Sequence, residues 1–190
     1  MLSTYEKTEG YVLETERLVL REMTDEDFPA LCKILQDEKT MYAYEGAFSD
    51  EEAKNWLNRM KERYANDGFG LWAVVLRESG EMIGQCGITM QNVEGTMEPE
   101  IGYLFQRAFW HHGYAAEAAS GCKEYAFRTL GLPGICSIIR DTNIASQNVA
   151  KRNGMTVKEQ FVKHYRGVDM PHYVFRISRE EWEKTGMEKV

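Results

Sequence analysis

The segment from residue 100 to residue 141 constrains the fold of this chain more than any other stretch. Two short apolar runs, EIGYLF (100–105) and ICSIIRD (135–141), flank a segment of helical pattern that begins near Gly113. The first run is rich in aromatic and branched residues. The second is continuously apolar, which is typical of a strand with both faces covered. The segment therefore predicts a strand, a helix and a strand at the centre of an α/β sheet.

The rest of the chain adds strands and amphipathic helices around this unit. Further strands are predicted at 17–22, 71–77 and 82–90, and as a pair within 155–179 around a turn near 166–169; further helices are predicted at about 25–36, 50–66 and 143–154. The stretch VEGTMEPE (93–100) is expected to form a loop. The resulting order is β-α-α-β-β-β-α-β-α-β-β, a mixed α/β sheet with helices on both faces. One domain is expected over residues 1–190, with its core at about 13–178.

Charge and composition disfavour several classes of protein. The formal net charge of −7 disfavours nucleic-acid binding and leans slightly towards a cationic partner such as an amine. No apolar run approaches the roughly 18 residues that cross a bilayer, and residues 1–10 do not resemble a signal peptide, so a soluble, cytoplasmic protein is expected. Cys32, Cys86, Cys122 and Cys136 lack the spacing of a metal site, so reduced thiols and no metal are predicted.

The stretch FWHHGYAAEAA (109–119) lies where the central strand gives way to the helix. The first amides of a helix have no partners within it, and the helix dipole adds positive charge, so this position suits an anion. Gly113 allows close approach of a ligand, and the alanines after it keep the first turns slim. The same residues also fit tight packing of helix on sheet, and this alternative stays open. The side chains of His111 and His112 have no predicted role.

Several segments in register resemble the GNAT N-acetyltransferases, closest to the RimJ/RimL branch of ribosomal-protein N-terminal acetyltransferases. FWHHGYAAEA resembles the pyrophosphate loop of the family, which typically runs W-G-x-G-Y-A-T-E-A. LETERLVLREMTDEDF resembles its opening strand and helix, EMIGQCGI its second and third strands, EIGYLF its central strand, and TNIASQNVAKRNGM its N-x-x-S-x-x-V-x-x-x-x-G-F segment. The resemblance covers about residues 13–175 and implies the GNAT fold with a splayed central sheet.

The same resemblance implies acetyl-CoA as the co-substrate and assigns its contacts residue by residue. Backbone amides of the loop would hold the pyrophosphate: those of His112, Gly113, Tyr114, Ala115 and Ala116. Backbone groups of the central strand would pair with the pantetheine arm: those of Tyr103, Leu104 and Phe105. A bulge is expected at Gly102, since glycine inside a strand often marks one. The side chains of Asn143 and Asn148 would also contact the cofactor.

The expected chemistry is attack of an amine on a thioester. An alkyl ammonium has a pKa of about 10 and must lose a proton first, so a base is needed. Glu100, at the start of the central strand, is the predicted base, acting directly or through a water; the alternatives are a charge that attracts the substrate and a cap on a nearby amide. Glu98 is interpreted as a solvated loop carboxylate. The amide of Leu104 or Tyr103 is expected to stabilise the oxyanion.

Departure of the thiolate is the second point of catalysis. Many GNAT enzymes carry a tyrosine at the position that is Ala150 here, and the RimL-type branch uses the serine that maps onto Ser146. Ser146 is therefore predicted to be catalytic, with a hydroxyl bonded within its helix as an equal alternative. The expected acceptor is a primary amine: a protein N-terminus, a polyamine or an aminoglycoside-like compound. The alternative function is a CoA- or acyl-CoA-binding module without catalysis, and a homodimer is compatible with the family.

Aromatic and histidine side chains outside the motifs have weaker assignments. Tyr42 and Tyr44 are candidates for the acceptor pocket, because in the family the first two helices cover it. Trp56 is interpreted as ordinary core. His164 and His172, in the C-terminal hairpin, are assigned to the surface or to strand pairing rather than to the acceptor cleft.

Overall fold

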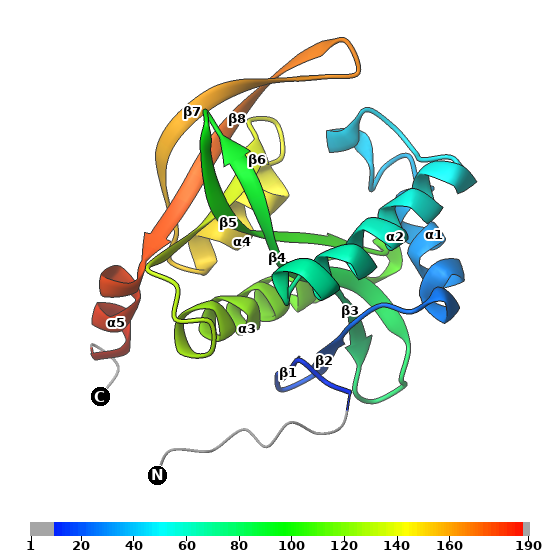
Figure 1. Cartoon of the computed structure of the whole chain (residues 1–190), viewed down its shortest axis with the longest axis horizontal. Helices are drawn as coiled ribbons and strands as arrows, with labels where there is room; N and C mark the ends of the chain where they lie inside the picture. The colour runs from blue at the N-terminus through cyan, green and yellow to red at the C-terminus, as the bar shows by residue number, and fades with distance from the viewer. Residues whose placement is uncertain (1–9, 188–190) are drawn as a thin grey trace.

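The computed structural model describes residues 10–187, and its strands join one eight-stranded sheet (Figure 1). In chain order the strands are β1 (Leu13–Glu14), β2 (Leu18–Arg21), β3 (Leu71–Leu76), β4 (Met82–Val93), β5 (Thr96–Phe105), β6 (Gly134–Arg140), β7 (Thr156–Tyr165) and β8 (Val168–Ser178). Their order across the sheet is β1-β2-β3-β4-β5-β6-β8-β7. Neighbouring strands run antiparallel except β5 and β6, which are parallel.

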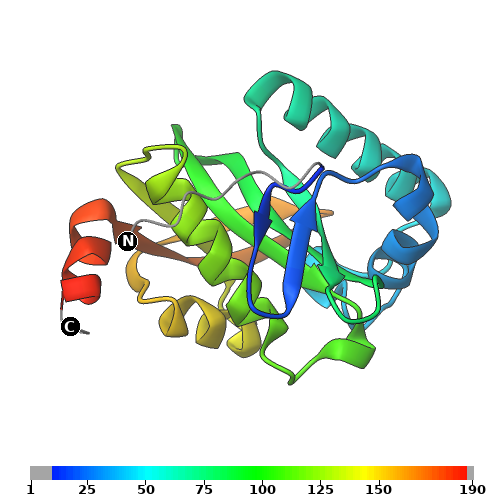
Figure 2. The same ribbon diagram turned by 90° about the horizontal axis from the view of Figure 1, so that it is seen from below.

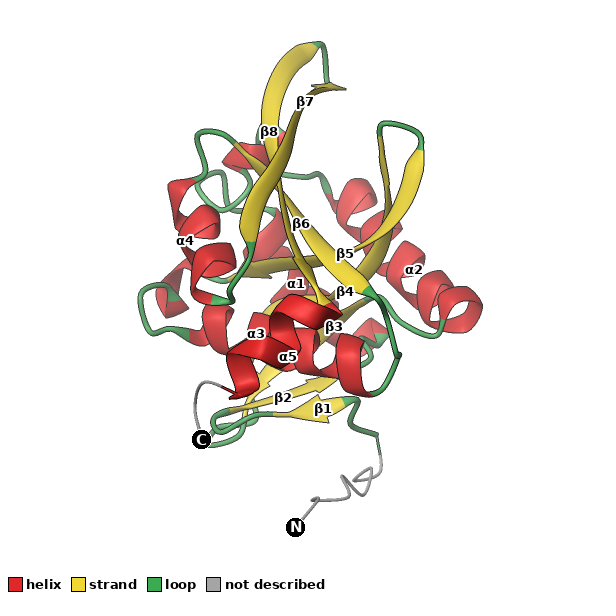
Figure 3. Cartoon of the chain, turned by 90° about the vertical axis from the view of Figure 1, so that its left-hand side faces the viewer, coloured by secondary structure: helices red, strands yellow, loops and turns green. Residues whose placement is uncertain are grey.

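Helices cover both faces of the sheet. The described α-helices are α1 (Phe28–Leu35), α2 (Asp50–Asp67), α3 (Tyr114–Arg128), α4 (Ile144–Arg152) and α5 (Arg179–Met187), and short 3₁₀ turns at Asp25–Asp27, Tyr42–Tyr44 and Arg107–Phe109 precede the first three. Helices α3 and α4 lie on one face, and α1 and α2 lie on the other (Figures 2 and 3). Each face has its own apolar core, to which α3 contributes Phe127 and α2 contributes Leu57. The predicted mixed α/β fold is confirmed.

Helix α2 begins and ends where local chemistry predicts. Ser49 Oγ accepts the amide of Glu52 at 3.2 Å, and Glu52 Oε2 accepts the amide of Ser49 at 2.8 Å. This reciprocal capping box satisfies two amides at the start of the helix. Gly68 ends the helix with a φ of 76°, a left-handed conformation that glycine adopts without steric cost. Buried side chains of the helix, such as Leu57 and Met60, then pack in the core on this face of the sheet.

The connection between β4 and β5 differs from the sequence-based expectation. Instead of a loop over 93–100, Glu94 and Gly95 alone join the two strands. Both residues have positive φ angles, 46° and 93°, which is the two-residue turn that matches the twist of antiparallel strands. The polar residues that suggested a loop belong to strand ends in solvent. Strand β5 therefore already includes Glu98.

Strands β5 and β6 separate after a single point of pairing. Only Glu100 and Cys136 pair between them, whereas β5 pairs with β4 along its whole length without a shift in register. The predicted bulge at Gly102 is therefore wrong, because Gly102 lies opposite Gly87 in an unbroken ladder. A Cβ at Gly102 would lie 3.4 Å from Leu71 Cδ2, at the limit of ordinary van der Waals contact. The predicted splay of the central sheet is confirmed, and it arises between β5 and β6.

Two elements were not predicted, the two-residue strand β1 and the helix α5. Helix α5 carries Trp182, whose ring stacks on that of Phe127 with 5.0 Å between centroids. It therefore extends the core beneath α3. No helix among residues 10–187 is long and apolar enough to cross a membrane. Residues 1–9, most of the segment judged not to be a signal peptide, lie outside the described residues.

Candidate active site

Side chains hold open the gap between β5 and β6. Glu100 Oε1 accepts the amide of Ile138 at 3.0 Å, and Ser137 Oγ donates to the carbonyl oxygen of Ile101 at 2.9 Å. Both main-chain groups face the neighbouring strand, where backbone pairing would otherwise continue the parallel ladder. The two side chains therefore take the place of strand pairing, and the strands diverge beyond them.

Alternate residues of β5 direct their main-chain groups into this gap. The amide of Gln106 donates to β4, whereas the carbonyl oxygen of Ile101 accepts from β6. Because main-chain groups alternate between the two sides of a strand, the amide of Tyr103 faces the gap and that of Leu104 faces β4. Of the two predicted oxyanion donors, the geometry supports Tyr103.

Phe105 fits only part of its predicted role. Its carbonyl oxygen already accepts Trp110 Nε1 at 3.0 Å, and its ring lies in the core on the α3 face. The ring of Tyr103 lies on the same face, and its hydroxyl donates to the carbonyl oxygen of Ser146 at 2.9 Å. Pairing with an extended ligand is therefore left to the main chain of Tyr103 and the amide of Phe105.

Glu100 lines a cavity of about 340 Å³. Burial raises the pKa of its carboxyl from 4.5 to about 7. The amide of Ile138 and the charges of Lys163 and Arg63 lower the pKa, but burial has the larger effect. A carboxyl that titrates near neutral pH suits general base catalysis. Oε1 accepts the amide of Ile138, so Glu100 does cap a nearby amide, which was one of the alternatives to a base. Oε2 has no hydrogen-bond partner among residues 10–187. The geometry therefore leaves Oε2 for proton transfer.

The cavity lies between the sheet, the α1–α2 region and the β7–β8 hairpin. The walls contributed by the last two are formed by Thr40, Ala43, Tyr44, Phe48, Trp56, Arg59, Met60, Arg63, Lys163, Tyr165, Met170 and His172. In Figure 1 the hairpin (orange) and the α1–α2 region (cyan) face each other above β5 and β6. Arg166, at the turn of the β7–β8 hairpin, connects the hairpin to the α1–α2 region. It pairs with Glu52 and lies 5.5 Å from the ring centroid of Phe48.

The aromatic and histidine assignments are partly confirmed. Tyr44 lines the cavity, whereas Tyr42 is 42% exposed and does not. Trp56 belongs to the core, as interpreted, and also lines the cavity. His172 lines the cavity as well as pairing in β8, and burial lowers its pKa. His164 is exposed and hydrogen-bonded to a neighbour on its own hairpin.

Glu98 is not the solvated loop carboxylate that was expected. It lies within β5 and accepts two hydrogen bonds from Arg176 of β8, from Nε at 2.8 Å and from Nη2 at 2.7 Å. These bonds hold the pKa of Glu98 below its usual range. The partner lies far along the sequence, so no local pattern revealed the pair. Because Glu98 is ionised and paired, Glu100 is the better candidate for the base.

The N-terminus of α3 has the conformation expected of an anion cradle. Gly113 is its N-cap with a φ of 82°, and no side chain caps the first turn. The amide of Glu117 makes the first helical bond, to the carbonyl oxygen of Gly113 at 3.1 Å. The amides before it therefore have no partner within the helix: those of Tyr114, Ala115 and Ala116.

The two histidines before Gly113 shape the loop. His111 has a φ of 64°, a left-handed conformation that is uncommon outside glycine. This fits the glycine found at that place in the family's W-G-x-G loop. His112 Nδ1 lies 2.7 Å from the carbonyl oxygen of Trp110, and its ring stacks on that of Tyr114. The side-chain contacts of His112 are thus with its neighbours in the loop and the first turn of α3.

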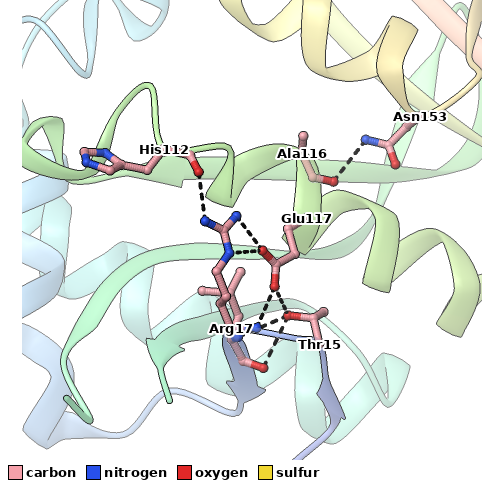
Figure 4. A network of polar contacts seen from close by, with 7 residues as sticks. Thr15, Arg17, His112, Ala116, Glu117 and Asn153 are labelled. Atoms are coloured by element: carbon pink, nitrogen blue, oxygen red, sulfur yellow. Dashed lines mark hydrogen bonds and ion pairs between the residues drawn. The ribbon is translucent and has the colours of Figure 1, made fainter. Parts of the chain in front are cut away.

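A polar network ties this loop to the first strands (Figure 4). Glu117 accepts Thr15 Oγ1 at 2.6 Å, the amide of Arg17 at 2.8 Å and Arg17 Nε at 2.7 Å. Arg17 Nη1 donates to the carbonyl oxygen of His112 at 3.1 Å, and its guanidinium lies 4.5 Å from the ring centroid of Tyr114. The opening motif and the loop motif therefore form one structural unit. Arg17 and Glu117 were not singled out from the sequence.

Helix α4 brings two predicted residues to the cavity. Asn143 Oδ1 accepts the amide of Ser146 at 3.1 Å and so caps the helix. Its Nδ2 group is left for a ligand. Ser146 also lines the cavity, and its Oγ has no hydrogen-bond partner among residues 10–187, so a bond within the helix is not observed. Asn148 is exposed and does not line the cavity.

Thiols and other metal-binding side chains are not gathered at this site. Within residues 10–187, no group of three or more histidine, cysteine, aspartate or glutamate side chains is arranged to hold a metal ion. The four cysteines are free, and Cys86 and Cys122 lie in the core with 3.6 Å between their sulfur atoms. The cysteines therefore contribute to packing.

The site thus combines a parallel strand pair that opens beyond one point of pairing, a helix N-terminus with free amides, and a carboxyl of raised pKa. The family described as the acetyltransferase (GNAT) domain matches residues 17–156. The chain therefore belongs to the GNAT acetyltransferases and is an N-acetyltransferase.

Known relatives and solved structures agree with this assignment. The chain is 33% identical to the uncharacterized N-acetyltransferase YnaD of Bacillus subtilis (strain 168) over 174 residues, which cover 90% of this chain and 98% of that protein. A GNAT acetyltransferase of Bacillus anthracis superposes with a TM-score of 0.76 at 26% identity, covering 88% and 98% of the two chains. RimL, a ribosomal L7/L12 α-N-protein acetyltransferase solved with coenzyme A, shares the fold with a TM-score of 0.70 at 17% identity, covering 86% and 95%.

Proposed function

We propose that this protein transfers the acetyl group of acetyl-CoA to a primary amine by direct attack, with both substrates bound together. The gap between β5 and β6 carries the proposal, because the amide of Tyr103 faces it and Glu100 stands at its closed end. When bound, acetyl-CoA supplies a thioester whose carbonyl carbon an amine can attack.

The residues of the site fit the two parts of this co-substrate. Unpaired amides at the start of α3, within His112–Ala116, suit the pyrophosphate. The backbone there is left-handed at Gly113, where a Cβ would lie 3.5 Å from Arg17 Nη2. The open side of β5 at Tyr103 suits an extended amide-bearing arm, since such an arm can pair as an added strand does. Asn143 and Asn148, from α4, would contact the same ligand.

Three groups of this chain would act on the reacting atoms. Glu100 Oε2 takes a proton from the acceptor amine, directly or through a water. The amide of Tyr103 donates to the carbonyl oxygen as negative charge develops on it. The hydroxyl of Ser146, which has no protein partner in the described part of the chain, donates a hydrogen bond to the leaving thiolate, and any proton it passes to the sulfur is replaced from water.

Release of free thiol tests the proposal, measured with acetyl-CoA and a panel of N-terminal peptides, polyamines and aminoglycosides. Thiol is expected only when a suitable amine is present. Acetyl-CoA is also expected to raise the melting temperature, because a ligand of the folded state stabilises it by about 2.7 kcal/mol at 100 times Kd. Absence of any thermal shift at millimolar acetyl-CoA would refute the co-substrate. A shift without thiol release would point to a binding module.

The proposal includes three features of the whole protein. One domain over residues 1–190 predicts a single unfolding transition. A cytoplasmic location predicts that the protein fractionates with soluble cell contents. A homodimer, compatible with the family, predicts twice the chain mass of 22.0 kDa in light scattering.

A further inference from the structure

The cavity beside Glu100 has the opposite sign of charge to the chain as a whole. Four basic side chains line it, and Glu100 is the sole acidic residue in its lining within the described range. The basic residues are Arg59, Arg63, Arg140 and Lys163. The chain carries a net charge of −7, so the basic residues at this position are a local feature that overall composition conceals.

Three of these cations have no ion-pair partner among residues 10–187. Arg140 pairs with Glu45, and its Nε is buried without a hydrogen-bond partner. Arg59 lies 5.4 Å from the ring centroid of Trp56, and neither it nor Arg63 nor Lys163 is within 4.0 Å of a carboxylate in the described chain. Arg59 and Lys163 are exposed and Arg63 is half-buried, whereas Arg17 and Arg176, which join separate elements of the fold, are paired. Unpaired cations beside a cavity are available to a ligand.

These cations are separate from the pyrophosphate cradle. The cradle, His112–Ala116, contributes no residue to the cavity lining. Arg63 and Lys163 do line the cavity, and they come from α2 and β7. Both act electrostatically on the Glu100 carboxyl. They therefore lie at the end of the cavity where the acceptor amine must be deprotonated.

We infer that the acceptor is a primary amine that also carries an anionic group, a carboxylate or a phosphate, held by Arg63 and Lys163 while its apolar part lies against Tyr44, Phe48 and Trp56. The inference rests on the proposed function and names its substrate class. Charge-assisted hydrogen bonds from arginine and lysine are the usual means of holding such anions. An amino acid or a phosphorylated small amine has this chemistry.

The same cations also favour the chemistry of such an acceptor. A like charge nearby destabilises the ammonium form of the amine, so the reactive neutral form becomes more populated. A polyamine or an aminoglycoside carries several positive charges, and these cations would repel it. The net charge of the chain slightly favours a cationic acceptor, whereas the basic residues at the cavity favour an acceptor that carries an anionic group.

Matched acceptors test the inference by thiol release with acetyl-CoA. Phenylalanine and phenethylamine differ by one carboxylate, and 2-aminoethyl phosphate and β-alanine distinguish phosphate from carboxylate. We expect kcat/KM for phenylalanine to exceed that for phenethylamine by about tenfold or more, since hydrogen bonds to charged groups are stronger than those between neutral groups. Spermidine is expected to be poorer still. Equal or better rates with phenethylamine or spermidine than with both carboxylate- and phosphate-bearing amines would overturn the inference.

Variants identify the residues responsible. R63Q/K163Q, and K163Q alone, should reduce the preference for phenylalanine over phenethylamine towards unity. K158Q should leave the preference unchanged, because Lys158 lies on the same strand but pairs with Glu181 outside the cavity. An unchanged preference in R63Q/K163Q would overturn the assignment.

A binding measurement separates this inference from the proposed function. Calorimetry with the CoA-bound protein should show tighter binding of phenylalanine than of phenethylamine, with the difference lost in R63Q/K163Q. If no amine releases thiol but this preference is seen, the proposed catalysis fails and the anion site stands. If amines are acetylated without the preference, the anion site fails and the catalysis stands.

Discussion

Replacement of Glu100 by glutamine is expected to stabilise the protein at alkaline pH while it removes the proposed base. Glutamine keeps an oxygen that can accept the amide of Ile138, so the gap between β5 and β6 stays open. It removes only the charge. In the native protein burial raises the pKa of this carboxyl from 4.5 to about 7, which means that ionisation of Glu100 opposes folding.

The magnitude follows from the two pKa values. Between about 4.5 and 7 the folded state binds more protons at Glu100 than the unfolded state, so this residue lowers the free energy of unfolding as pH rises. The rise in pKa corresponds to at most about 3.5 kcal/mol, at about 1.4 kcal/mol for each unit. Because the carboxyl lines a cavity that water enters, we expect about 1–3 kcal/mol at about pH 9, and almost nothing at about pH 4.

Urea unfolding of the two proteins, followed by tryptophan fluorescence across this pH range, measures the difference. E100Q should be more stable above neutral pH, with the gain fading on acidification, and its thiol release should fall sharply with acetyl-CoA affinity preserved. E98Q is the matched control on the same strand. Arg176 lowers the pKa of Glu98, so E98Q should be less stable at neutral pH, with the deficit shrinking as acid protonates Glu98 in the native protein. A gain for E100Q that does not vary with pH, or a loss at about pH 9, would refute the reasoning.

Four further predictions concern the base, the cradle and the cavity wall. Thiol release by the native enzyme should rise with pH through about 7, because the base must be ionised, and E100Q should lack that rise; an identical profile in both would exclude Glu100. G113A should weaken CoA binding in calorimetry, since a side chain at the φ of 82° costs about 1–2 kcal/mol. The control G131A has a similar φ of 69° in open space and should lose stability but not affinity. Equal losses of affinity in the two variants would contradict the cradle. E117Q should lower both the melting temperature and CoA affinity by removing the charge that holds Thr15 and Arg17. E124Q on the same helix, whose carboxylate bonds Arg128 and Trp182 away from the loop, should leave affinity intact. W56F should cost about 1–3 kcal/mol in urea unfolding, because Trp56 Nε1 donates to the buried Gln85 Oε1 at 2.9 Å and Gln85 Nε2 has no partner in residues 10–187; unchanged stability would show that this bond is dispensable.

Local patterns predicted the parts of this protein that are local in space. The order of the main elements, the capping box of α2 and the glycine at the start of α3 all depend on residues a few positions apart. The splay of the sheet came from the resemblance to the GNAT family. Its cause, Glu100 bonded to the amide of Ile138, joins residues 38 positions apart and has no sequence signature.

The errors have the same origin. Glu98 looked like a loop carboxylate because Arg176 is 78 residues away, and the two-residue turn before β5 was concealed by polar strand ends. The sign of charge in the cavity was invisible because Arg63 and Lys163 lie 100 positions apart. Net charge is an average over the surface and carries no information about the few side chains that converge on one site.

The opening between β5 and β6 is a sheet edge that lies inside the molecule. Unpaired strand edges on a protein surface invite pairing with other chains, and natural proteins shorten, charge or cover them. Here β8 and β7 continue the sheet beyond β6, so the edge at Tyr103 is flanked by structure on both sides. Main-chain groups at this inner edge are therefore unpaired without lying at the outer edge of the sheet, where unpaired groups promote aggregation.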